Sequence, residues 1–272
     1  MKRFVITDWC HERIRQMFLP DGNTDACGTA FASPSDSPDH EGQGKEKAFF
    51  IDATAGTGKD TLFLSELLGE NGGEILAMDI QEMALQKTRE RLLKNGYTEC
   101  PGRCSDGKKN VGDMERPGAE HVTGCGKDVP GCPEKTVEQK DEKKNRAVLQ
   151  DAAGRKRIRL LLRGHEHMDE YVPDGLADLI MFNLGYLPGG DHGLATKPAT
   201  TLMALTKALR LLKPGGLLSL MIYSGGDSGF EEKKQVLAWL KDLDPQRYMV
   251  LVEAFYNRPN HPPLPVFVRK LW

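Results

Sequence analysis

Short apolar runs alternate with helical patterns along most of this sequence, and this alternation limits the fold more than any other feature. The runs are too short for buried helices, so they predict strands. Strands that are separated by helices are joined by crossover connections, which make neighbouring strands parallel. The sequence therefore predicts an α/β fold, doubly wound and Rossmann-like, with a mostly parallel sheet. In chain order, the expected elements are a helix at 8–19, a strand at 48–53, a helix at 58–69, a strand at 74–79, a helix at 81–95, strands at 158–162 and 177–183, a helix at 198–212, a strand at 217–223, a helix at 230–243 and strands at 248–256 and 265–270.

Two stretches, residues 21–46 and 98–156, interrupt the alternation. The first is rich in Gly, Ser, Pro and Asp and the second in Gly, Lys, Glu and Asp, and both contain few large apolar residues. Segments of that composition bury too little apolar surface to offset the entropy that ordering costs. We therefore expect a single domain over residues 1–272, interrupted by disordered insertions at 21–46 and 98–156.

Charge and hydropathy exclude several classes of protein. The net charge of −2 and the pI of about 6.4 exclude a polycation that coats nucleic acid by charge alone. No apolar run reaches the roughly 18 residues that a membrane span needs, and the first residues lack the apolar segment of a secretory signal. These features predict a cytoplasmic protein without a membrane partner.

Six cysteines are present, and four of them, Cys100, Cys104, Cys125 and Cys132, fall in the second insertion. In a chain without a secretory signal we expect reduced thiols rather than a disulfide framework. The cysteine spacings differ from the C-x2-C pairs of zinc sites, and the two histidines within 165–167 have no further ligand cluster nearby in the sequence. We therefore expect no metal, with a zinc site at the cysteines or a metal at the histidines as the alternatives.

A glycine loop follows the first expected strand. Gly56 and Gly58 stand where the strand turns into a helix, and glycine suits a backbone that turns tightly or lies against a ligand. The dinucleotide fingerprint needs a third glycine where this chain has Thr61, and Ala53 and Asp60 are incompatible with a phosphate-binding P-loop. The loop therefore favours a smaller adenosine cofactor, and a tight turn without a ligand is the alternative.

The second expected strand ends in Asp79, about 20 residues beyond the glycines. A carboxylate at that place can accept hydrogen bonds from both ribose hydroxyls of an adenosine. We therefore assign Asp79 to the ribose. The alternative is that its side chain caps the helix that starts near Gln81.

The strand at 177–183 ends in Asn183, and Tyr186 follows in a turn. In a doubly wound sheet the carboxyl ends of the strands line the ligand crevice. The side-chain carbonyl of Asn183, with a nearby backbone carbonyl, can accept hydrogen bonds from an amine and orient the nitrogen lone pair toward a methyl donor. Tyr186 offers a ring that can stack on a flat substrate and a hydroxyl that can orient it. The alternative for Asn183 is an Asx turn.

Further polar residues stand near other strand ends. His165 and Glu166 follow the strand at 158–162, where an acid can bind the adenine amino group or a substrate amine; a polar loop is the alternative. Tyr223 and Asn257 could line the same crevice, although either could be a core or turn residue. The arginines within 155–163 could track a phosphate backbone or form a solvated face.

Taken together, these segments resemble a specific family, the small bacterial rRNA methylases of the YtqB type, which are related to the tRNA wobble-uridine enzyme MnmM. The matching segments are spread over nearly the whole core, and the most specific of them runs from Asn183 to Gly190. They are Ile51–Gly56, Asp60–Leu64, Asp79–Gln81, His165–Glu166, Phe182–Asp191, Thr196, Asn257 and Pro262–Pro263, together with the Lys-Pro-Gly-Gly step at 213–216 that precedes a strand and a late hairpin.

The resemblance implies a class I methyltransferase fold with a seven-stranded, mostly parallel sheet and a C-terminal antiparallel hairpin. It also implies S-adenosyl-L-methionine as cofactor and a homodimer. The implied reaction is methyl transfer to the aminomethyl nitrogen of 5-aminomethyl-2-thiouridine at the tRNA wobble position, so the implied partner is the tRNA anticodon region. Asn183 and Tyr186 are then the catalytic candidates. The candidates for binding the cofactor are Asp52, Ala53, Thr54, Gly56, Gly58, Asp60, Asp79, Ile80, Gln81, His165, Glu166, Asn183 and Leu184.

The chain departs from the usual family pattern at two places. Thr57 and Lys59 replace an asparagine and a histidine in the glycine loop, and Gly225–Gly226 replaces a Gly-His pair after the fifth strand. Any acid/base or RNA contact by that second histidine is therefore absent from this chain. Methylation of ribosomal RNA, and non-catalytic RNA binding on a methyltransferase fold, are the alternative functions.

Overall fold

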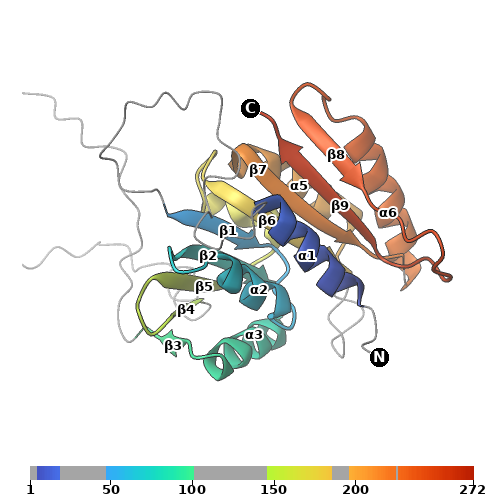
Figure 1. Ribbon diagram of the computed structural model, residues 1–272. Helices are drawn as coiled ribbons and strands as arrows, with labels where there is room; N and C mark the ends of the chain where they lie inside the picture. The colour runs from blue at the N-terminus through green and yellow to red at the C-terminus, as the bar shows by residue number, and fades with distance from the viewer. Residues whose placement is uncertain (1–4, 19–46, 101–145, 186–195, 225) are drawn as a thin grey trace, which may run out of the picture.

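The computed structural model describes residues 5–18, 47–100, 146–185, 196–224 and 226–272. Within these residues the strands are β1 (Ala48–Asp52), β2 (Gly73–Asp79), β3 (Thr98–Glu99), β4 (Arg146–Gln150), β5 (Lys156–Leu162), β6 (Ala177–Leu184), β7 (Leu212–Ile222), β8 (Tyr248–Val252) and β9 (Leu264–Lys270). They form one sheet in the order β3-β4-β5-β2-β1-β6-β7-β9-β8 (Figure 1). The five central strands are parallel, and the two strands at each edge pair antiparallel. The doubly wound α/β class is confirmed.

Helices cover both faces of the sheet. One face carries α1 (Ile6–Phe18), α2 (Lys59–Leu67) and α3 (Glu82–Lys94), and the other carries the 3-10 helix η2 (His165–Glu170), α5 (Pro198–Leu211) and α6 (Gly226–Lys241). Each α-helix turns an apolar side to the sheet, as in α3, where Ala84, Thr88 and Leu92 are buried at helical spacing. None of the helices in the described residues is long and apolar enough to cross a membrane.

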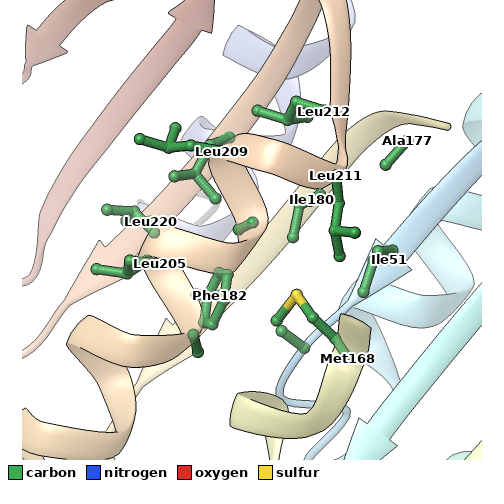
Figure 2. Close-up of a cluster of buried hydrophobic side chains, with 14 of the residues drawn as sticks. Ile51, Met168, Ala177, Ile180, Phe182, Leu205, Leu209, Leu211, Leu212 and Leu220 are labelled. Atoms are coloured by element: carbon green, nitrogen blue, oxygen red, sulfur yellow. The ribbon is translucent and has the colours of Figure 1, made fainter. Parts of the chain in front are cut away.

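An apolar core between the sheet and α5 supports the carboxyl end of β6 (Figure 2). Ile51 and Ile180 come from neighbouring strands and belong to one buried cluster with Leu205 of α5 and Met168 of η2, and all four side chains are fully buried. Phe182 belongs to the same cluster and is also buried. Burial of a side chain of this size contributes about 1.5–3 kcal/mol. Because Phe182 directly precedes Asn183, this packing fixes where the end of β6 lies.

Two strands, β3 and β4, lie inside the second expected insertion, so the predicted extent of that insertion was too long. β3 and β4 lie within residues 98–156, which the composition predicts to be disordered. Leu149 of β4 is buried, and Asp151 Oδ1 closes the turn to β5 by accepting hydrogen bonds from the backbone nitrogens of Arg155 and Lys156, at 2.7 and 3.1 Å. β4 lies next to the edge strand and buries little more than Leu149, and a strand that packs only one face needs few apolar residues, so composition did not reveal it.

The strand count changes accordingly. Within the described residues the sheet has nine strands, where seven were expected, and the two additional strands are β3 and β4. The predicted C-terminal hairpin is confirmed as β8 and β9 at the opposite edge. Residues 21–46 and 101–145, the remainder of the two expected insertions, lie outside the described residues.

The Lys-Pro-Gly-Gly step at 213–216 comes just after the end of α5, and regular pairing of β7 with β6 resumes beyond it, at Leu217. α5 ends at Leu211 and β7 begins at Leu212, so residues 213–216 form the start of β7. The register between β6 and β7 shifts between Ala177 and Leu179, and Gly215 has a φ of 77°. Glycine adopts this left-handed conformation without strain. The resulting bulge lets the strand begin where the helix ends.

Candidate active site at the carboxyl edge of the sheet

The carboxyl ends of β2, β1 and β6 are neighbours in the sheet, and the glycine loop lies between them. The Ala53 nitrogen donates to the Met181 carbonyl of β6 at 2.9 Å, and the Ala55 nitrogen donates to the Met78 carbonyl of β2 at 2.8 Å. The loop is therefore held from both sides. This arrangement places Asp52, the last residue of β1, beside the ends of the two strands that carry the other candidate residues.

The two glycines of the loop have different surroundings. Gly56 has a φ of 54°, and its nitrogen donates to Asp79 Oδ2 at 2.9 Å. Gly58 has a φ of 74° and precedes α2, and a Cβ there would lie 2.7 Å from Thr88 Cα of α3. Gly58 is thus required for the close approach of α2 and α3. The expected contact of Gly58 with the cofactor stays a prediction.

Asp79 joins the glycine loop to the turn after β2. Its Oδ2 accepts from Gly56, and its Oδ1 accepts from the Gln81 nitrogen at 2.9 Å. The alternative of a helix cap is not found, because Gln81 itself is the N-cap of α3. Burial raises the pKa of Asp79, while hydrogen bonds from the backbone of Gln81, Gly56 and Ile80 act against that rise. Ile80 is 53% exposed and presents an apolar side chain beside this carboxylate.

Asp52 is a buried carboxyl group beneath the loop. It is 1% exposed, and it accepts hydrogen bonds from the Thr54 nitrogen at 3.2 Å and from the Thr61 hydroxyl at 2.6 Å. Burial raises its pKa, and the nearby negative charge of Asp60 raises it further. Asp52 is therefore shielded from solvent and holds the loop to α2 through its hydrogen bonds with Thr54 and Thr61.

We expect Asp52→Asn to become relatively more stable than wild type as the pH rises. A carboxyl group with a raised pKa binds its proton more tightly in the folded state, so its stabilisation is present at low pH. It is lost between the ordinary carboxyl pKa of about 4 and the raised value. The oxygen of asparagine can still accept from the Thr54 nitrogen, its NH2 group can donate to the Thr61 hydroxyl in place of accepting from it, and the amide does not titrate. Each pH unit between the two pKa values corresponds to about 1.4 kcal/mol.

Thermal unfolding of both proteins at about pH 5 and about pH 8 measures this difference. The melting temperature of Asp52→Asn minus that of wild type should increase from the lower to the higher pH. A difference that stays constant or falls would mean that the pKa of Asp52 is not raised. Asp244→Asn, at an exposed turn, controls for the general effect of removing a carboxylate.

Asn183 is held at two points at the end of β6. Its backbone nitrogen donates to Thr54 Oγ1 at 2.7 Å, and its side-chain Nδ2 donates to Asp60 Oδ2 at 3.1 Å. Asp60 comes from the first turn of α2 and is buried. Asp60 Oδ1 lies 2.7 Å from Nε2 of His11, a residue of α1 that the sequence did not single out. Three predicted residues therefore meet, and a fourth joins them from the N-terminal helix.

His165 lies under the site at the start of η2. It is 8% exposed, and its ring packs edge-on to Phe182 with centroids 5.6 Å apart. Burial lowers its pKa, while the charge of Glu166 and a backbone hydrogen bond with Ala53 act in the opposite direction. Within the described part of the chain, no group is hydrogen-bonded to the buried Nε2. A buried polar atom of this kind is suited to a bound ligand.

Glu166 and the adjoining histidine do not form a metal site in the described residues. The carboxylate of Glu166 folds over Gly164, and His167 Nε2 lies 3.6 Å from it, while His167 Nδ1 lies 2.7 Å from Glu170. The described residues contain no group of three or more His, Cys, Asp or Glu side chains that could hold a metal. Cys104, Cys125 and Cys132 lie outside those residues.

Gly185 and Thr196, the residues that flank the segment with the second catalytic candidate, are hydrogen-bonded to each other at this edge of the sheet. Tyr186 itself lies outside the described residues, but Gly185 and Thr196 exchange two hydrogen bonds of 3.0 Å. The Thr196 hydroxyl in turn donates to Glu232 at 2.7 Å, and Thr201 donates to the other oxygen of Glu232 at 2.6 Å. Glu232 of α6 is 4% exposed and was not predicted from the sequence. Glu232 therefore anchors Thr196, and Thr196 in turn holds Gly185 at the end of β6.

Of the remaining candidates, Tyr223 lies at the site, whereas Asn257 and the arginines after residue 155 lie elsewhere. Tyr223 follows β7 and lies next to Gly185, where a Cβ would be 3.7 Å from its ring. Burial, followed by the charge of Asp60 and that of Cys10, raises its pKa to about 12. Asn257 lies in an exposed turn. Arg157 and Arg159 of β5 form ion pairs with Glu74, and Arg163, which follows β5, forms one with Glu170.

Comparisons with known proteins agree with this architecture. A family model described as "Putative rRNA methylase" matches residues 136–269. The protein "tRNA (mnm(5)s(2)U34)-methyltransferase, chloroplastic" of Arabidopsis thaliana is 33% identical over 217 residues, which cover 78% of this chain and 74% of that protein.

Two solved structures extend the likeness to three dimensions. A "putative rRNA-methylase" from Clostridium thermocellum is 29% identical with a TM-score of 0.62, and the match covers 99% of this chain and 100% of that one. A "putative methyltransferase" from Streptococcus mutans, solved in complex with SAH, is 32% identical with a TM-score of 0.54, over 82% and 89% of the two chains. The chain therefore belongs to the rRNA methylase family of the YtqB and MnmM type, within the class I S-adenosylmethionine-dependent methyltransferases.

Proposed function

We propose that this protein transfers a methyl group to the aminomethyl nitrogen of 5-aminomethyl-2-thiouridine at the wobble position of tRNA. The chain is an RNA methyltransferase, and its cofactor is S-adenosyl-L-methionine. The observation that carries the finer proposal is the held amide of Asn183 at the end of β6. The proposed reaction also agrees with the wobble nucleoside that appears in the name of the Arabidopsis relative.

The residues around the glycine loop fit an adenosine cofactor. Both carboxylate oxygens of Asp79 accept hydrogen bonds from the backbone, and a carboxylate has about four lone-pair sites, so both ribose hydroxyls can also donate to it. Ile80 is exposed beside Asp79 and can cover a face of the adenine ring. S-adenosylmethionine supplies an electrophilic methyl group on a sulfonium sulfur, which keeps the electron pair of the broken C–S bond.

Asn183 orients the substrate amine. Because its Nδ2 donates to Asp60, its Oδ1 turns the other way and can accept an N–H of the amine, as can a nearby backbone carbonyl. Two accepted hydrogen bonds leave the nitrogen lone pair directed at the methyl carbon. An amide is uncharged, so it does not favour the ammonium form as an adjacent carboxylate would. The amine forms the N–C bond and then releases a proton to water.

Labelled methyl transfer separates this proposal from the runner-up, methylation of ribosomal RNA, which the family description favours. The purified protein is incubated with methyl-labelled S-adenosylmethionine and either bulk tRNA that carries 5-aminomethyl-2-thiouridine or ribosomal RNA. We expect label in tRNA and none in ribosomal RNA. Label in ribosomal RNA alone would replace the proposal by its runner-up. The homodimer, the contact with the anticodon region and the cytoplasmic location stay predictions.

A further inference from the structure

His11 of α1 connects the N-terminal helix to the candidate active site. Its Nε2 lies 2.7 Å from Asp60 Oδ1, and its side chain is 14% exposed. The imidazole also stacks flat on the buried ring of Phe63, with centroids 3.9 Å apart and an angle of 2° between the rings. Arg15 lies 5.0 Å from the centroid of the Phe63 ring. The position of His11 is therefore fixed by a ring contact as well as by its hydrogen bond.

Asp60 is held between two side chains that come from distant parts of the chain. His11 meets Oδ1, and Asn183 Nδ2 donates to Oδ2 at 3.1 Å. A carboxylate accepts hydrogen bonds, so Nε2 of His11 carries the proton of that bond. With both oxygens engaged, rotation of the carboxylate would break a hydrogen bond inside a buried site and leave a polar group there without a partner. The carboxylate plane of Asp60 is thereby fixed.

The orientation of the Asn183 amide depends on this plane. Its nitrogen faces Asp60 Oδ2, while its backbone nitrogen is held separately by Thr54. If Asp60 rotates, the amide can rotate with it or turn its nitrogen away from Asp60. Its oxygen would then no longer face the amine. The chemistry at Asn183 thus depends on a group that is two hydrogen bonds away.

We propose that His11 is a positioning residue for methyl transfer, because it fixes Asp60 and through Asp60 the amide of Asn183. This inference rests on the proposed role of Asn183 in orienting the amine. α1 is then part of the active site, although it precedes the glycine loop by a long stretch of sequence. The competing explanation is that His11 matters only for packing, through its stack on Phe63.

Two substitutions separate the hydrogen bond from the stack. His11→Phe keeps a flat ring on Phe63 but has no donor for Asp60. His11→Gln loses the ring but places an N–H donor at a similar distance from the backbone. We measure kcat, KM for tRNA, cofactor affinity and melting temperature for both, with the wild type as reference. Cofactor affinity and melting temperature identify any variant whose fold is altered.

Positioning predicts that His11→Phe loses roughly 10- to 100-fold in kcat with little change in cofactor affinity. His11→Gln should regain most of that loss. Packing through the stack predicts the reverse order, with His11→Phe close to wild type. Full kcat in His11→Phe, or an equal loss in both variants, would overturn the proposal.

A second readout does not require turnover and keeps this inference separate from the proposed function. The side-chain amide NMR signals of Asn183 are assigned by their absence in Asn183→Asp. Positioning predicts that they shift or broaden in His11→Phe and stay near their wild-type place in His11→Gln. Unchanged signals in both variants would overturn it. If wild type does not methylate this tRNA, the proposed function fails, and the NMR comparison still decides whether His11 positions Asn183.

Discussion

Replacing Asn183 with alanine should lower kcat by roughly 100-fold or more while the affinity for S-adenosylmethionine stays close to that of wild type. The change removes the acceptor that orients the amine and leaves the backbone of β6 and its hydrogen bond to Thr54 in place. It also removes the partner of Asp60 Oδ2, so a small loss of stability is expected. Steady-state kinetics with tRNA and calorimetry with the cofactor measure the two effects separately.

Asn95→Ala is the matched control for this prediction. It makes the same chemical change at the exposed C-cap of α3, where the side-chain nitrogen donates to the Arg91 carbonyl. We expect wild-type kinetics from it. If Asn183→Ala methylates tRNA as fast as Asn95→Ala does, Asn183 does not orient the amine.

The second large effect is expected at Asp79. Asp79→Asn should weaken the binding of S-adenosylmethionine about 100-fold, which corresponds to about 2.8 kcal/mol. One carboxylate oxygen becomes an NH2 group that cannot accept from a ribose hydroxyl. The same NH2 faces the nitrogen of either Gly56 or Gln81, both of which are donors, so the loop itself is disturbed. Isothermal calorimetry gives the affinity directly.

Asp244 provides a control with the same local geometry. Asp244 Oδ1 accepts from the backbone nitrogen two residues on, Gln246, at 2.9 Å, as Asp79 Oδ1 accepts from Gln81. Asp244→Asn should therefore reproduce any general effect of the substitution at such a turn without changing cofactor affinity. Equal affinities for Asp79→Asn and wild type would show that Asp79 does not bind the ribose.

The sequence predicted the parts of this molecule that depend on local patterns. The apolar faces of α3 and α5 repeat at helical spacing, and the central strands are continuous apolar runs, so their places were evident. The carboxyl ends of parallel strands meet at one edge, so Asp79 and Asn183 could be placed near each other from the sequence alone. β4 escaped detection because a strand that buries little more than Leu149 has the composition of a polar loop.

The parts that were missed depend on contacts between distant residues. His11 and Asp60 are 49 residues apart across an expected insertion, and Glu232 is 36 residues from Thr196. No local pattern marks His11 or Glu232 as a site residue, because a histidine on an amphipathic helix and a glutamate in a charged helix are common. Gly58 was assigned to the cofactor, but the structure shows that it also allows α2 to approach Thr88.

The identity of the methylated nucleoside tests the central claim most directly. Wild-type protein is incubated with S-adenosylmethionine and tRNA that carries 5-aminomethyl-2-thiouridine, and the digested nucleosides are identified by mass spectrometry. We predict that this nucleoside gains about 14 Da, the mass of one methylene group, on its aminomethyl nitrogen. An unchanged 5-aminomethyl-2-thiouridine, in a reaction where cofactor binding is measurable, would contradict the proposed substrate while leaving the methyltransferase fold intact.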